Sequence, residues 1–154
     1  MFTGQSVKNI TKVKRSDLFL DVAQTTVGTV YVPQTILDAK DALPLGTLLT
    51  SLDGGKTWGP LTTPLFEAGS YAADAEVYFE GHIYKSLVAD NETAPNEGDW
   101  NDLGAWDANG VLYNDLTESK KTTVVVTGSV KENYLHGSDE FLVATLFKNK
   151  IIAK

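Results

Sequence analysis

Cysteine is absent from the 154 residues of this sequence, which excludes disulfide scaffolds, zinc knuckles, iron–sulfur ligation and thiol nucleophiles. Long apolar runs are absent as well: no stretch approaches the length of a bilayer span, and the N-terminus lacks the apolar core of a signal peptide. We therefore expect an intracellular or particle-bound protein with no cofactor, no metal and no membrane association. The remaining composition, 42% hydrophobic and 21% charged, suits one ordinary globular domain or two small ones.

Histidine is scarce, which limits catalytic chemistry. The two histidines, His82 and His136, lie far apart in the chain. His136 is close in sequence to Ser138 and Asp139, but three residues within one turn and helix start seldom converge as base, nucleophile and orienting acid. The Gly55-Lys56-Thr57 segment is similar to the end of a phosphate loop but lacks the first glycine of that motif. The sequence therefore predicts no enzymatic activity, and a small hydrolase built around the acidic residues would have no positioned base.

The charges divide the chain into two parts. Residues 66–107 carry ten acidic side chains and one lysine, a net charge of -9, whereas the rest of the chain carries +2. Such asymmetry indicates separate modules, and phosphate repulsion argues against nucleic-acid binding by the acidic one. Five of the acidic residues could supply oxygen ligands to calcium, but without a recognised spacing a solvated acidic loop is favoured. These five are Asp90, Glu92, Glu97, Asp99 and Asp102.

Local patterns predict a mainly β fold: a β-rich α+β body with one C-terminal helix, plus a small all-β inserted module. The most distinct strand is Thr122–Lys131, rich in β-branched residues. A helix is expected from Asp139 to Lys148, with Ser138 as its N-cap. Residues 1–22 show no sustained periodicity and are expected to form an extended arm. Further predicted elements are strands at 26–32, 47–52, 110–114 and 151–152, and a helical turn at 35–40.

A compact turn is expected at Ser51-x-Asp53-x-Gly55-x-Thr57-Trp58. This pattern resembles the Asp-box of sialidases and other β-propellers, where it shapes a hairpin tip away from the catalytic site. A propeller would repeat the motif in every blade, and this chain has a single copy. The motif therefore predicts that Asp53 caps its own turn and that Trp58 packs over the hairpin.

The acidic segment carries a second pattern: Tyr71, then Val77-Tyr78-x-x-Gly81-x-x-Tyr84, then Pro95 and Trp100. It resembles the small chitin- and cellulose-binding modules of carbohydrate-binding families 5 and 12. Strands at 77–79 and 82–87 would pair through a tight turn at residues 80–81. The resemblance implies carbohydrate binding through exposed aromatic side chains, and the alternative is that every aromatic belongs to the core. The candidate carbohydrate-binding residues are Trp100, Tyr84, Tyr71 and Tyr78, and the first two are preferred for their polar neighbours.

The C-terminal third carries the last resemblance. Ala108–Asp115, the strand ending in Val124-Val-Val-Thr-Gly-Ser-Val-Lys131, and a helix running into Ile151-Ile152 look like head decoration proteins related to that of phage lambda. The resemblance implies a homotrimer on the outer surface of the capsid in the virion, made in the host cytoplasm. Its partner would be the major capsid protein, contacted through the basic arm residues Lys8, Lys12, Lys14 and Arg15.

These observations predict three parts: an arm at 1–22, a body formed by 23–65 and 107–154, and a carbohydrate-binding-like module at 66–106. The expected function is a capsid decoration protein that stabilises a phage head and displays a module for cell-surface or mucus glycans. The alternative is a stand-alone carbohydrate-binding accessory protein.

Overall fold

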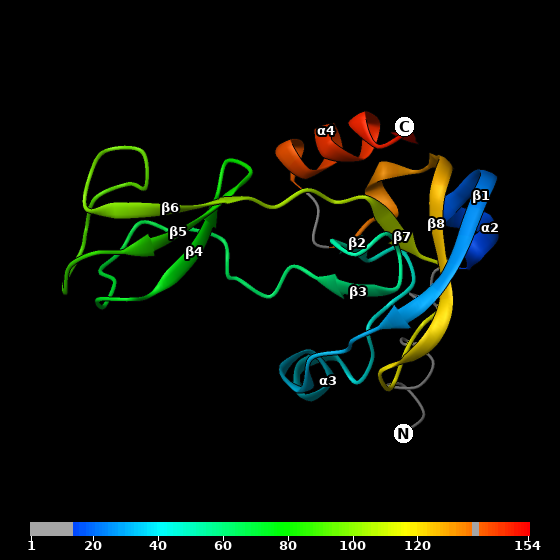
Figure 1. Ribbon diagram of the computed structural model, residues 1–154, viewed down its shortest axis with the longest axis horizontal. Helices are drawn as coiled ribbons and strands as arrows, with labels where there is room; N and C mark the ends of the chain where they lie inside the picture. Colours follow the sequence, from blue (N-terminus) through cyan, green and yellow to red (C-terminus); the bar gives the residue numbers. More distant parts are fainter. Residues whose placement is uncertain (1–13, 137–138) are drawn as a thin grey trace, which may run out of the picture.

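Two separate β-sheets form the molecule and lie toward opposite ends of its longest axis (Figure 1). The computed structural model describes residues 14–136 and 139–154. The larger sheet contains β1 (Phe19–Val30), β2 (Leu48–Thr50), β3 (Thr57–Pro60), β7 (Gly110–Leu112), β8 (Lys120–Val130) and β9 (Ile151–Ala153). The smaller sheet contains β4 (Glu76–Phe79), β5 (His82–Ser86) and β6 (Trp100–Ala105). The helices are α2 (Arg15–Leu18), α3 (Gln34–Lys40), the 3-10 turn η1 (Glu132–Tyr134) and α4 (Glu140–Lys148). The predicted mainly β class with a C-terminal helix is confirmed.

The larger sheet closes on itself into a small barrel. Its order is β1-β3-β2-β7-β8, and β1 also pairs with β8 along most of its length, which brings the first and last strands together. β9 adds to the free part of β8 in parallel, with Gly128 opposite Ile151. At a bulge in this region, an added Cβ on Gly128 would lie 2.2 Å from the carbonyl oxygen of Asp21, so only glycine fits there.

The interior of the barrel is built around Trp58. This side chain is 4% exposed and packs with Val30, Leu49 and other apolar residues. Two glycines make room for it: an added Cβ would lie 2.8 Å from the indole ring at Gly28 and 2.5 Å from it at Gly110. Trp58 therefore packs inside the barrel as well as against its own turn.

Helix α4 joins the barrel to the inserted module. Leu142 and Leu146 are fully buried in a cluster that also contains Tyr78 of β4. Asp139 is the N-cap, since its Oδ1 accepts a hydrogen bond from the backbone nitrogen of Leu142 at 2.8 Å. The predicted helix is thus confirmed to within one residue, but the cap is Asp139, and the predicted cap Ser138 lies outside the described residues.

The predicted arm of residues 1–22 is too long. Residues 15–18 form α2, and β1 begins at Phe19. Leu18 is fully buried in the same cluster as Leu142 and Leu146 of α4. The pairing of β1 with β8 runs from Phe19 opposite Val130 to Val30 opposite Lys120. The partners are about 100 positions apart, so local periodicity carries no trace of the pairing. Residues 1–13 lie outside the described part of the chain.

No helix among residues 14–136 and 139–154 is long and apolar enough to cross a membrane.

Candidate functional site: an aromatic face on the inserted module

One face of the three-stranded sheet carries most of the module's aromatic residues. The hairpin pairs Phe79 with His82 and Val77 with Tyr84, as predicted, and β6 pairs with β5 on the other side. Because directly paired residues point to the same side of a sheet, one face is shared by Phe79, His82, Tyr84, Trp100 and Asp102. The opposite face carries Tyr78 and Ile83, which pack toward the body.

Trp100 belongs to an aromatic cluster at one end of this face. Its ring centroid lies 5.4 Å from that of Tyr71 and 6.2 Å from that of Phe66, in edge-to-face arrangements. The indole nitrogen donates a hydrogen bond to the carbonyl oxygen of Thr93 at 2.9 Å. All three rings keep intermediate exposure. Trp100 is therefore a fixed part of the module's packing that shows only part of its surface to solvent.

Tyr71 is held in the same way. Its hydroxyl donates to the carbonyl oxygen of Glu67 at 2.7 Å and accepts from the Glu67 backbone nitrogen at 3.0 Å. Its ring stacks on Phe66 with centroids 5.6 Å apart. Both the apolar and the polar parts of Tyr71 are thus engaged within the module.

The loop between β5 and β6 is organised by a buried asparagine that sequence reasoning missed. Asn91 is 2% exposed, and its Nδ2 donates to Ser86 Oγ and to the carbonyl oxygen of Asp99, both at 3.0 Å. Its Oδ1 accepts from the backbone nitrogen and the hydroxyl of Thr93. This network fixes Thr93, the acceptor for Trp100, so the asparagine positions the aromatic cluster indirectly. Its only signal in the sequence is a polar residue at a turn.

Tyr84 is surrounded differently, by polar groups that reach solvent. Its ring centroid lies 6.2 Å from that of His82. His82 Nδ1 is 2.9 Å from Asp102 Oδ2, and the two side chains are 43% and 45% exposed. The face therefore presents an aromatic ring next to an accessible imidazole–carboxylate pair.

The electrostatics of this pair keep the carboxylate ionised. The hydrogen bond from His82 lowers the pKa of Asp102, with help from the Gly104 backbone nitrogen, which donates to Oδ1 at 2.8 Å. Burial raises the pKa of Tyr84, and the nearby charges of Asp102 and Glu80 raise it further. At neutral pH the site therefore offers a neutral phenol ring and an anionic hydrogen-bond acceptor.

The prediction that Tyr78 binds carbohydrate is wrong. Tyr78 is 1% exposed and lies in the core cluster against α4. Its hydroxyl donates to Asp139 Oδ1 at 3.3 Å, and burial raises its pKa far above the ordinary value. Tyr78 positions the module on the body, because its strand register turns it away from the aromatic face.

The predicted capsid-binding residues are only partly described. Lys8 and Lys12 lie outside the described residues, and Lys14 is exposed at the start of α2. Arg15 is engaged within the chain: its Nε donates to the carbonyl oxygen of Tyr113 at 3.0 Å, its Nη2 donates to Asn114, and its guanidinium lies 4.6 Å from the centre of the Tyr113 ring. Arg15 therefore helps to fasten α2 to the barrel.

The described acidic side chains of the module do not gather into a group of three or more. Among residues 14–136 and 139–154, no group of three or more histidine, aspartate or glutamate side chains comes together as a ligand set. The calcium interpretation of Asp90, Glu92, Glu97, Asp99 and Asp102 thus has no convergent ligands to support it.

The predicted turn at residues 51–57 forms as expected. Asp53 Oδ1 accepts hydrogen bonds from Ser51 Oγ at 2.9 Å and from the backbone nitrogens of Lys56 and Thr57 at 3.0 and 2.9 Å. The Thr57 hydroxyl donates to Oδ2 at 2.5 Å, and these bonds, led by that of Thr57, lower the pKa of Asp53 to about 2. The turn is thus closed by its own side chains.

Among known proteins, the chain matches no family model, no curated protein and no solved structure.

Proposed function

We propose that this protein decorates the outer surface of a phage head, with the barrel body held against the shell and the acidic module displayed away from it. One observation carries the proposal: the described chain enters the barrel through α2 at the end of the long axis opposite to β4, β5 and β6 (Figure 1). A shell-binding arm attached at α2 would therefore leave the module pointing outward. The resemblance of residues 108–152 to head decoration proteins agrees with this arrangement.

Such a protein acts through binding alone. A ligand that binds only the assembled shell stabilises that state by mass action, and the stabilisation grows with the logarithm of the ligand concentration relative to its Kd. Stabilisation of this kind requires no reactive side chain in the body. The basic arm would add electrostatic attraction to an acidic shell surface. Homotrimers at positions of three-fold symmetry would repeat each contact three times, so modest individual contacts would give high occupancy.

The test is the composition of purified particles. Particles from the virus or host that encodes this chain, separated on a density gradient, should contain the protein in a fixed ratio to the major capsid protein. Recovery of the protein only as free material in the supernatant would overturn the proposal and favour the stand-alone carbohydrate-binding accessory protein.

The role of the arm has its own test. The double variant Lys8→Glu, Lys12→Glu should lose binding to undecorated shells, whereas the matched variant Lys120→Glu, Lys121→Glu, on exposed positions of β8, should bind normally. Equal binding by both variants would contradict the anchoring role.

A second ligand, a glycan, is proposed for the module because the Tyr84 ring lies beside the exposed His82–Asp102 pair. A sugar can stack its C–H face on such a ring while its hydroxyls donate to the carboxylate. The net charge of -9 over residues 66–107 repels anionic glycans, so neutral saccharides are the expected class. Many copies on one particle would raise a weak affinity to high avidity.

Decorated particles on a glycan array should therefore retain neutral glycans, and Tyr84→Ala and Asp102→Asn should each reduce retention. Tyr31→Ala, which removes a 56% exposed tyrosine from the body, serves as the matched control. Retention that survives Tyr84→Ala, or that is confined to sialylated and sulfated glycans, would contradict this assignment.

A further inference from the structure

The turn between β2 and β3 holds an aliphatic side chain almost entirely in solvent. Leu52 is 96% exposed, the most exposed large apolar residue among those described. It is not on a loose loop, because Ser51 and Asp53 on either side are fixed by the hydrogen bonds that close the turn. The Asp53 carboxylate next to Leu52 is also exposed, and its low pKa keeps it anionic. The turn is therefore a rigid projection with an aliphatic tip and a negative charge.

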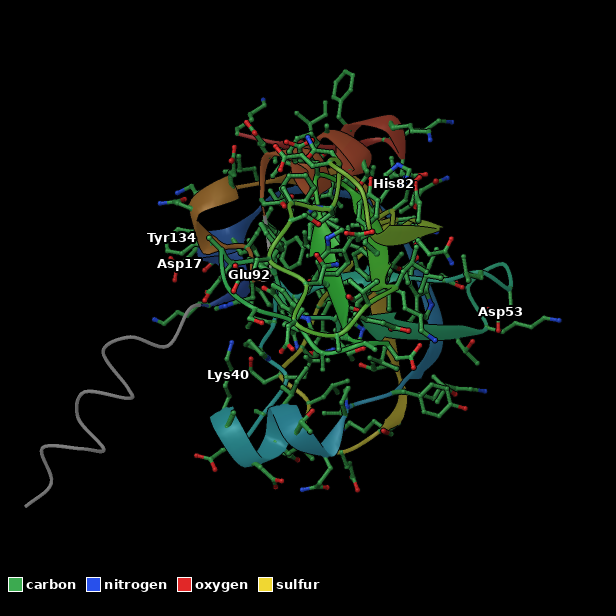
Figure 2. All side chains as sticks on the ribbon, turned by 90° about the vertical axis from the view of Figure 1, so that its left-hand side faces the viewer. Asp17, Lys40, Asp53, His82, Glu92 and Tyr134 are labelled. Atoms are coloured by element: carbon green, nitrogen blue, oxygen red, sulfur yellow. The ribbon has the colours of Figure 1, made fainter. Side chains whose placement is uncertain are left out.

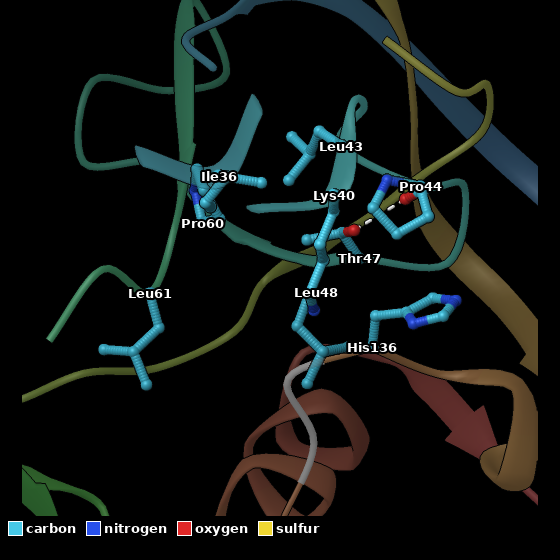
Figure 3. Close-up of a pocket in the computed structure, with 9 residues that line it drawn as sticks. All are labelled: Ile36, Lys40, Leu43, Pro44, Thr47, Leu48, Pro60, Leu61 and His136. Atoms are coloured by element: carbon cyan, nitrogen blue, oxygen red, sulfur yellow. Dashed lines mark hydrogen bonds between the residues drawn. The ribbon is translucent and has the colours of Figure 1, made fainter. Parts of the chain in front are cut away.

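The body also has a hollow of matching character. A pocket of about 100 Å³ opens beside α3 and is lined by apolar side chains that include Ile36, Leu43 and Leu61 (Figure 3). A cavity of about 150 Å³ accommodates benzene, so this volume suits one branched aliphatic group such as the end of a leucine. The size and lining of the pocket thus fit the side chain of Leu52.

Two basic side chains, Lys40 and His136, complete the pocket wall (Figure 3). Burial lowers the pKa of His136, and the nearby Lys40 ammonium lowers it further. The carboxylate of Asp115 acts in the opposite direction. Within the described part of the chain, Lys40 forms no salt bridge. Because its pKa is lowered, His136 is largely neutral at neutral pH, and an incoming carboxylate would pair with the Lys40 ammonium. The charge of the pocket is thus complementary to that of Asp53.

The projection and the pocket lie on opposite sides of the body. Figure 2 shows Asp53 and Lys40 at opposite edges of the molecule, so one copy cannot bring them together by itself. We propose that Leu52 and Asp53 of one copy dock into the pocket lined by Lys40 and His136 of a second copy, so that copies associate head to tail. A contact between two different surfaces of the same chain closes into a ring when the rotation between neighbours permits, and otherwise extends into a filament.

Sedimentation velocity of the full chain tests the contact. The wild-type protein should pass from monomer to oligomer between about 1 and 300 µM, because one aliphatic anchor with a charge pair gives a modest affinity. Leu52→Ser should weaken association about tenfold or more, and so should Lys40→Glu, which replaces attraction to Asp53 with repulsion. Leu87→Ser, at a 62% exposed leucine of the module, should associate like the wild type. A wild-type chain that stays monomeric throughout, or unchanged association in Leu52→Ser, would overturn the proposal.

Mixing the two variants separates this contact from a general loss of association. The Leu52→Ser chain keeps an intact pocket and the Lys40→Glu chain keeps an intact projection. The mixture should therefore form heterodimers at concentrations at which each variant alone stays monomeric. A mixture that sediments as two monomers would count against the contact, because each half would then be present without binding the other.

The absence of cysteine allows a covalent version of the test. In the double variant Leu52→Cys, Lys40→Cys, one thiol replaces the neighbour of Asp53 and the other replaces Lys40. Asp53 and Lys40 are at opposite edges of the molecule (Figure 2), so oxidation can join the thiols only between copies. One closed covalent species would indicate a ring, and a ladder of sizes an open chain; either supports the contact. Monomers after oxidation, as in the control Leu87→Cys, Lys40→Cys, would refute it. Since no shell is present, failure here would leave the shell-binding proposal standing, and success would not establish it.

Discussion

Replacement of Tyr78 measures how firmly the inserted module is joined to the body. The ring is 1% exposed and packs in the cluster that contains Leu142 and Leu146 of α4. Truncation of a fully buried aromatic side chain costs about 3 to 5 kcal/mol, so Tyr78→Ala should lower the free energy of unfolding by that amount. Tyr78→Phe keeps the ring and removes only the hydroxyl that donates to Asp139 at 3.3 Å, which should cost about 0.5 to 1.5 kcal/mol.

The assay is urea denaturation followed by tryptophan fluorescence and by far-ultraviolet circular dichroism. Because Tyr78 belongs to the same cluster as the helix, both signals should shift together in Tyr78→Ala, and α4 should lose stability with the module. Tyr78→Phe should leave glycan retention unchanged, since the ring does not reach the aromatic face. A loss below about 1 kcal/mol in Tyr78→Ala, or a shift confined to one signal, would refute the reasoning that module and body share a core.

Three further predictions concern local features. Trp100→Ala should cost about 2 to 4 kcal/mol by urea denaturation, somewhat less than for a fully buried tryptophan; an unchanged midpoint with loss of glycan retention would instead make Trp100 a sugar contact. Glu80 adopts φ 47° before Gly81 at φ 91°, a turn conformation that asparagine adopts more readily than glutamate. Glu80→Asn should therefore raise the free energy of unfolding by about 1 kcal/mol, and a lower melting temperature would contradict this. The pKa of Asp53 falls from 3.8 to about 2 on folding, so the ionised carboxylate stabilises the folded state above pH 3.8 and this stabilisation is lost as the pH falls toward 2. The melting temperature of Asp53→Asn should therefore depend less on pH in that range than that of the wild type. An unchanged dependence would refute this contribution of Asp53 to stability.

Features that depend on neighbours within a few residues could be predicted from the sequence. The Asp53 turn could be predicted because its donors and acceptors lie within four positions of the carboxylate. The hairpin at Glu80-Gly81 followed from a tight turn between alternating residues, and it also fixed which β4 and β5 residues pair. Helix α4 followed from apolar spacing and an acidic first turn. In each case the stabilising contacts are local, so the pattern is visible in a short stretch of sequence.

Features that depend on distant partners could not be predicted, because they arise from the way the whole chain folds. β1 begins at Phe19 because β8, about a hundred residues later, offers it a pairing edge. The sequence pattern predicts Tyr78 at a binding face, but Tyr78 is buried because it lies on the side of β4 that packs against α4. The His82–Asp102 pair joins residues 20 positions apart through the register of β5 and β6. Strand pairing and burial are properties of the closed fold, and a one-residue change of register would reverse which side chains reach solvent.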